Sequence, residues 1–139
     1  FQEHYANGLK DGKAIKYYDN DSIAEVIMWE NGEKAGLWEQ FYQDGTKRLK
    51  GYHKDGQRHG KFTTWYSNGN ISTSGQYKKG LMDGVWEHYK ENGEHDINIE
   101  YDMGRMIVNS ELEKRQKEFS SKIEKLIREM PEPNTIEKR

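Results

Sequence analysis

The stretch that decides the fold is KDGQRHGKFTTWYSNG, residues 54–69. It contains Gly56 and Gly60 four positions apart, then the aromatic pair Trp65-Tyr66, then Asn68-Gly69. The same arrangement recurs along the chain, because glycines stand at positions 8, 32, 56, 80 and 104, and again at 12, 36, 60 and 84. The step is 24 residues in both sets. A constant period of this length indicates a repeat protein, in which each repeat is one supersecondary unit.

Each repeat is predicted to form one β-hairpin. An aromatic-rich segment comes first, a turn follows, and a second segment ends in a ring such as Trp29 or Tyr77. Full repeats begin at Gly12, Gly36, Gly60 and Gly84. No helical pattern follows the glycines, so we do not interpret them as a phosphate-binding loop.

The turns inside the predicted hairpins are rich in Asn, Asp and Gly. They are Asn20-Asp21, Asp44-Gly45, Asn68-Gly69 and Asn92-Gly93. Asn-Gly and Asp-Gly favour a two-residue type I′ turn, because both central residues need positive φ. The Gly-x-x-x-Gly segments, such as Gly56 to Gly60, are then expected to be the crossings between hairpins.

A two-residue turn would fix the register and therefore the two faces of the sheet. Trp38 and Phe62 are expected to face Gly51 and Gly75 across their hairpins, since a large ring can cover a bare strand position. The same core face is predicted to carry Tyr42, Tyr66, Ile23, Leu49, Ile71, Ile97, Trp29, Tyr77 and Tyr101.

The other predicted face is polar apart from four aromatic residues at one repeat position. We call these residues the aromatic row; they are Tyr17, Phe41, Trp65 and Tyr89. Two interpretations stay open at this stage. The row is either a binding surface for a partner, or a set of rings that stiffens the sheet by packing or lies under a neighbouring element.

The sequence changes character after Gly104, and residues 109–130 are predicted to form an amphipathic helix. Ser110-Glu-Leu-Glu113 reads as a capping box with Ser110 as N-cap. Pro131 ends the helix, and residues 131–139 are expected to be a flexible tail. The apolar stripe consists of Leu112, Phe119, Ile123, Leu126, Ile127 and Met130. We expect this stripe to pack on the chain's own sheet, although it also suits a helix dimer.

The array itself is predicted to occupy residues 1–108, with a partial repeat over residues 1–11. Tyr5 and Gly8 match the last part of a repeat, so Phe1 is expected to stand in the second strand of a hairpin. This interpretation predicts that the chain is a fragment of a longer protein. It also predicts an open N-terminal edge strand that could join copies into a homo-oligomer.

These residues carry a family resemblance. The pattern Gly-x-Trp-x-x-Phe/Tyr-Tyr-x-Asn/Asp-Gly, followed by Tyr-x-x-Gly-x-x-x-Gly, resembles the MORN-repeat family over roughly residues 5–104. The similarity is greatest to the bacterial variant found in antitoxin-like proteins. The first repeat departs from the pattern at Ala14 and Asp21. The expected fold is all-β: an elongated, single-layer antiparallel meander of tandem hairpins, completed by a C-terminal α-helix.

The composition narrows the possible functions. Hydrophobic residues make up 32% of the chain and aromatic residues 12%, so large rings must supply much of the core. The net charge of −2 favours neither nucleic acid nor an anionic membrane as partner. There is no cysteine and no apolar run of membrane-spanning length. These features do not assign the protein to a cellular compartment.

Nothing in the sequence resembles catalytic machinery. The five histidines fall at five different repeat positions, and we predict no metal, no cofactor and no enzymatic activity. His53 and His59 are the pair that could approach across a turn. The histidines are His4, His53, His59, His88 and His95.

Basic residues gather between the hairpins, at Lys47, Arg48, Lys50, Lys54, Arg58 and Lys61. The family resemblance implies phospholipid binding, and these residues would be its site. Asp44 and Asp55 balance the cluster locally, however, so we interpret it first as a solvated strand edge. Our leading prediction is instead a non-catalytic protein-binding module that uses the aromatic row. The resemblance to antitoxin-like proteins implies that the partner is a toxin, which the module would mask. The alternatives are a membrane-surface scaffold and a structural element that self-assembles through residues 110–130 or the N-terminal edge.

Overall fold

The structure is a computed structural model that describes residues 5, 6 and 8–129. The predicted tail, residues 131–139, lies outside this part of the chain, as do residues 1–4, residue 7 and the stripe residue Met130. Within it the chain forms twelve strands and one helix. The strands are β1 (Tyr5–Ala6), β2 (Leu9–Lys10), β3 (Gly12–Tyr17), β4 (Ile23–Glu30), β5 (Glu33–Phe41), β6 (Lys47–Lys54), β7 (Gln57–Arg58), β8 (Gly60–Trp65), β9 (Ile71–Lys78), β10 (Leu81–Tyr89), β11 (His95–Asp102) and β12 (Arg105–Met106). The helix is α1 (Glu113–Arg128).

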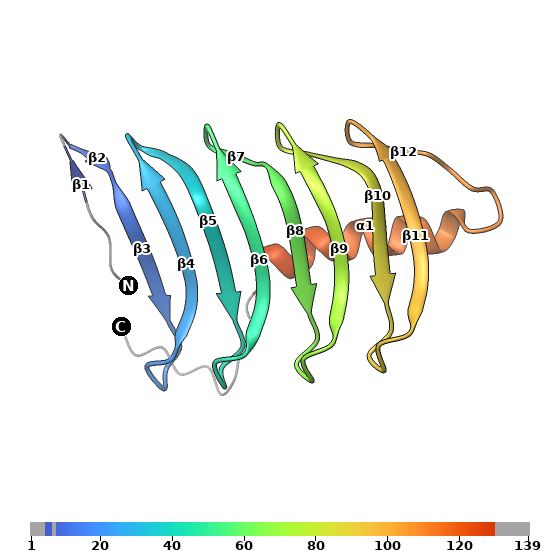
Figure 1. Cartoon of the computed structure of the whole chain (residues 1–139), viewed down its shortest axis with the longest axis horizontal. Coiled ribbons are helices and arrows are strands. Elements are labelled where there is room, and N and C mark those ends of the chain that lie inside the picture. Colours follow the sequence, from blue (N-terminus) through green and yellow to red (C-terminus); the bar gives the residue numbers. More distant parts are fainter. Residues whose placement is uncertain (1–4, 7, 130–139) are drawn as a thin grey trace.

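Neighbours in the sequence are neighbours in the sheet. Ten strands form one antiparallel sheet in the order β12-β11-β10-β9-β8-β6-β5-β4-β3, with β7 paired to β6. β1 and β2 form a separate two-stranded sheet. Figure 1 shows an open, gently twisted meander with α1 lying across one face, from β11 towards β6. The predicted all-β antiparallel meander with a C-terminal helix is confirmed.

The turns, however, differ from the prediction. The two-residue loops are at Asn31-Gly32, Asp55-Gly56, Lys79-Gly80 and Met103-Gly104, where both residues have positive φ. At Asp55-Gly56, for example, Lys54 pairs directly with Gln57. These segments were expected to be crossings between hairpins, but they are type I′ turns. Both kinds of connection are therefore hairpin loops, and the sheet is one continuous meander.

The loops predicted as type I′ are longer. The Tyr42 amide donates to the Thr46 carbonyl over 2.8 Å, and the Gly45 amide donates to the Tyr42 carbonyl over 2.9 Å. Gly45 has a φ of 90°, whereas Asp44 is not among the residues with positive φ. This is a three-residue loop, in which a type I turn is followed by a bulged glycine.

The extra loop residue moves two predicted core residues to the opposite face. Ile23 pairs with Tyr17, and Ile71 pairs with Trp65, so both isoleucines share a face with the aromatic row. They are 39% and 42% exposed. The prediction that Ile23 and Ile71 belong to the core is therefore wrong, because it assumed a loop of two residues.

The predicted pairing of rings with glycines is confirmed. Trp38 pairs with Gly51, and Phe62 pairs with Gly75. Trp86 of the next hairpin also lies on Gly75, since a Cβ atom there would stand 2.2 Å from its ring. These rings belong to one core cluster between the sheet and α1, together with Leu49, Tyr77, Ile97, Ile99, Tyr101 and Ile123.

The helix packs on the chain's own sheet, as expected. Ile123 is 2% exposed, and Phe119, Leu126 and Ile127 pack against the core cluster. The apolar stripe that would also suit a helix dimer is thus used within the chain. At the C-terminal end of α1, Gln40 donates to the Ile127 carbonyl over 3.2 Å.

The start of α1 corrects a second prediction. The N-cap is Leu112, without a side-chain cap, so Ser110 does not form the predicted capping box. Gln116 organises this region instead. Its side-chain oxygen accepts a hydrogen bond from the backbone amide of Asn109 over 3.1 Å, and its side-chain nitrogen donates to the backbone carbonyl of Ile107 over 3.2 Å. The apparent polar gap in the helix stripe is therefore a buried brace, with Gln116 2% exposed.

Successive repeats are also joined by a series of tyrosines. The hydroxyl of Tyr18 donates to the carbonyl of Phe41, which lies one repeat further along the chain. Tyr42 binds the carbonyl of Trp65 in the same way, and Tyr66 binds that of Tyr89. Each bond ties one hairpin loop to its neighbour.

Candidate functional site

The candidate site is the outer face, by which we mean the face of the sheet that points away from α1. Gln40 on β5 contacts α1, and Thr64 on β8 is fully buried on the same side. Because successive side chains alternate between the two faces of a strand, Phe41 and Trp65 point to the outer face. The structure therefore places the aromatic row where the sequence predicted it.

The row is more continuous than the sequence indicated. Each ring is paired with a side chain of the neighbouring strand, so eight residues cross the sheet in one line. The pairs are Tyr17 with Ile23, Phe41 with Lys47, Trp65 with Ile71, and Tyr89 with His95. The four rings are half-buried, and their partners are exposed. We call these eight residues the extended row.

Contacts within the extended row hold some of its rings in place. The Lys47 ammonium lies 5.6 Å from the centre of the Trp65 ring, a cation–π distance. Tyr89 and His95 meet edge to face, with ring centres 5.8 Å apart. The Tyr89 hydroxyl donates to the Glu87 carboxylate, and this hydrogen bond raises the pKa of Tyr89.

The predicted basic patch does not form one surface. Arg48 is buried on the α1 side, where it donates to the Gln40 amide and to the Glu129 carbonyl. Arg58 also faces α1 and pairs with Glu124 over 2.6 Å. Lys47, Lys50, Lys54 and Lys61 alternate with helix-facing residues and lie on the outer face. Two of the six cations are thus used to hold the helix.

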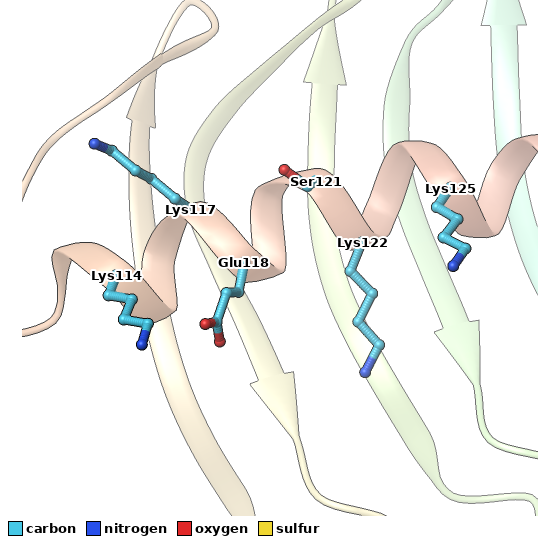
Figure 2. Close-up of a pocket in the computed structure, with 6 residues that line it drawn as sticks. All are labelled: Lys114, Lys117, Glu118, Ser121, Lys122 and Lys125. Carbon is cyan, nitrogen blue, oxygen red and sulfur yellow. The ribbon is translucent and has the colours of Figure 1, made fainter.

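A second group of lysines was missed in the sequence. Figure 2 shows Lys114, Lys117, Lys122 and Lys125 with Glu118 and Ser121 on the exposed side of α1. Their spacing follows the helical period, which would have been the signal. Lys117 pairs with Glu113 over 3.4 Å.

Two histidines are part of the core. The His88 ring stacks on Phe119 with centres 4.4 Å apart, and its Nδ1 lies 3.1 Å from the Thr73 hydroxyl. Burial lowers the pKa of His88 to about 4, and it does the same for His53 with help from Lys34 and Arg58. Both imidazoles are therefore neutral at pH 7.

A metal centre and a membrane-spanning helix are two further features that would bear on the function. Across residues 5, 6 and 8–129, no three His, Asp or Glu side chains converge in a way that could hold a metal ion. In the same part of the chain, no helix combines the length and apolar character needed to cross a membrane.

Comparison with known proteins gives one family match. The model of the MORN repeat variant matches residues 58–79, which include β8, β9 and the loop between them. No curated protein matches the chain. The matched segment covers most of one period of the 24-residue repeat, and the same pattern recurs in the neighbouring hairpins. The match supports a relation to MORN-repeat proteins, and this relation suggests a non-catalytic binding or scaffold module.

Proposed function

We propose that the chain is a protein-binding module whose outer face receives a protein partner along the extended row. The observation that carries this proposal is that the row is not needed for the core. The core cluster lies on the other face, beneath α1. The outer face nevertheless presents Phe41 and Trp65 at its centre, flanked by Ile23 and Ile71 at about 40% exposure.

The chemistry of the row suits a protein surface. Aromatic side chains supply large contact areas at a low cost in conformational entropy, and they are enriched among the residues that dominate binding energy. Polar side chains that can hydrogen-bond to a partner, such as Lys50 and Ser74, lie next to the row. The row itself is mixed, with Lys47 and His95 between the rings.

The resemblance to antitoxin-like MORN proteins makes a toxin the first partner to test. In that role the sheet would cover the active surface of the toxin and mask it. This extension rests on the family analogy alone, because a repeat fold serves many functions.

The test is an affinity capture from native lysate with three forms of the chain. These are the wild type, the double variant Phe41→Ala/Trp65→Ala, and Tyr52→Ala, which removes a ring of 40% exposure from the same face outside the row. We expect a partner that binds the wild type and Tyr52→Ala equally well and that is not captured by Phe41→Ala/Trp65→Ala. Truncation of one anchoring ring costs about 2 kcal/mol or more, which is roughly 30-fold in affinity.

The competing function, a membrane-surface scaffold, gives a different result. Binding to anionic vesicles would fade between low and moderate salt, whereas capture through the row would tolerate salt. Equal capture by all three forms, with each shown to be folded by circular dichroism, would reject the extended row as the binding surface.

A further inference from the structure

Of the described residues, those of α1 cover only part of their side of the sheet. α1 ends at Arg128, near β6, and does not extend across β4 and β3 (Figure 1). Beside this end lies a recess of about 210 Å³, which we call the cationic recess. Its charged and titratable lining consists of Lys16, Glu25, Lys34, His53, Arg58 and Arg128. The recess holds several times the roughly 30 Å³ that one water molecule occupies.

The charges of the recess do not cancel. Four cations stand against one carboxylate, that of Glu25. This carboxylate already accepts hydrogen bonds from the Trp38 indole over 3.1 Å and from Gln40 over 2.9 Å. Lys16 reaches it at 3.9 Å. Glu25 therefore has little capacity left for the remaining cations.

Two of the cations have no anionic partner among the described residues. Arg58 is paired with Glu124, but neither Lys34 nor Arg128 forms an ion pair in this part of the chain. The negative end of α1 does not compensate them either. Its carbonyls at Ile127 and Glu129 are occupied by Gln40 and Arg48.

His53 lies next to these cations, in a buried position. Its ring stands 4.8 Å from that of Trp38, and its buried Nδ1 has no hydrogen-bond partner. After burial, the charges of Lys34 and Arg58 are the causes that lower its pKa to about 4. A buried polar atom without a partner in a native protein calls for a physical explanation.

We propose that the cationic recess is a binding site for an oxyanion, a carboxylate or phosphate group held by Lys34 and Arg128. The planar guanidinium of Arg128 suits the two oxygens of either group, and the flexible Lys34 supplies a point charge. A partly enclosed site strengthens both interactions relative to the open surface. The anion is carried either by an acidic peptide or by a phosphate ester, and both sources share this chemistry.

The experiment follows the imidazole signals of the full ¹⁵N-labelled chain by NMR. Inorganic phosphate and N-acetylglutamate are titrated separately, at constant ionic strength set with sodium chloride. We expect a saturable shift of the His53 signals and a rise in its pKa, since a bound anion offsets the charges of Lys34 and Arg58. The signals of His88, beneath the middle of α1, should stay unchanged.

Matched variants locate the site. Lys34→Gln/Arg128→Gln should weaken binding at least tenfold, because each charge-assisted hydrogen bond contributes about 1.5–3 kcal/mol. Lys117→Gln/Lys125→Gln removes the same charge from the exposed side of α1 and should leave the affinity unchanged. Arg128→Gln alone is the second variant if the first fails to fold.

Each outcome decides the proposal. Tighter binding of phosphate identifies a phosphate ester as the source, tighter binding of N-acetylglutamate identifies an acidic peptide, and equal binding supports the shared chemistry. The proposal is overturned if neither probe gives a saturable shift at His53, or if both double variants weaken binding equally.

Discussion

At Gly75 the absence of a side chain is a packing requirement. A Cβ atom at this position would stand 2.2, 2.4 and 2.6 Å from three ring atoms of Trp86, which is fully buried. Gly51 occupies the same repeat position one hairpin earlier, yet its nearest ring atoms would be 3.1 and 3.2 Å away. Neither glycine has a positive φ, so the two positions differ in space and not in backbone strain.

We therefore predict that Gly75→Ala destabilises the chain by about 3 kcal/mol and Gly51→Ala by about 1 kcal/mol, within the range for overpacked cores. Urea unfolding of the two variants and the wild type measures both losses. Equal losses would mean that Trp86 can shift away from Gly75 without cost.

The buried imidazole of His88 predicts a dependence of stability on pH. Its pKa is about 4 in the folded chain and about 6.5 when unfolded. The unfolded state therefore binds more protons between these values, and the stabilisation present above pH 6.5 is lost as the pH falls towards 4. For a shift of this size the loss between pH 7 and 5 is about 2 kcal/mol.

The comparison with His88→Gln isolates this contribution, because other groups titrate equally in both proteins. We expect the variant to lose about 2 kcal/mol less than the wild type when urea unfolding is moved from pH 7 to 5. His53 continues to contribute in the variant, so its slope does not vanish. Parallel pH profiles would contradict a neutral, buried His88.

Among the elements, the hairpin loops show how far sequence reasoning reaches. The period of 24 residues predicts the hairpins and their order correctly, because each repeat carries its own strands and glycines. The type of loop is another matter. Asp44-Gly45 and Asp55-Gly56 are the same dipeptide, yet the first ends a three-residue loop and the second is itself the loop. Pairing of the flanking strands decides this, and a dipeptide does not encode it.

The start of α1 gives a similar contrast between local pattern and tertiary contact. Ser110 fits the capping-box pattern but makes no cap, whereas Gln116, which interrupts the apolar pattern, binds two backbone groups of the preceding loop. Its role depends on where that loop lies. The helical pattern alone could not predict it.

We expect Gln116→Leu to destabilise the chain by about 2 kcal/mol, although it adds an apolar residue to the stripe. The substitution leaves the backbone amide of Asn109 and the carbonyl of Ile107 without their side-chain partner in a partly buried region. Ser110→Ala should change the free energy of unfolding by less than about 0.5 kcal/mol, as for most surface positions. Urea unfolding measures the loss of stability in each variant. A larger loss for Ser110→Ala than for Gln116→Leu would support the capping box instead.

On the scale of the whole molecule, α1 divides the array into two parts. It contacts β5, β7, β10 and β11 through Gln40, Arg58, His88 and Asp96. β3 lies outside this span and depends mainly on its pairing with β4. In a repeat array, stability is nearly a sum of repeats and their interfaces.

We predict that native-state hydrogen exchange is fastest in β3 and slowest in β8 to β10. Ile123→Ala, which removes a side chain that is 2% exposed, should cost about 2–5 kcal/mol in global unfolding. Protection should fall strongly in β8 to β10 and little in β3. Uniform loss of protection along the array would mean that the repeats unfold as one unit.

The candidate site was predictable only where it follows the period. The aromatic row repeats every 24 residues and was found from the sequence, but Ile23 and Ile71 joined it through the bulged loops. The cationic recess has no sequence signature. Its lining comes from β3, β4, β5, β6, β7 and α1, which the fold alone brings together.

The series of tyrosines has a consequence for how the array ends. Tyr18, Tyr42 and Tyr66 each need a carbonyl from the following repeat. The next residue in this series is Lys90, beyond which the structure shows β11 and β12 and then α1. A tyrosine at this position would have no carbonyl of a following hairpin to which its hydroxyl could donate a hydrogen bond. The ammonium group of a lysine, in contrast, is hydrated by water. Lys90 thus marks the last repeat of the series. A design that adds a further hairpin to the array would therefore begin with Lys90→Tyr.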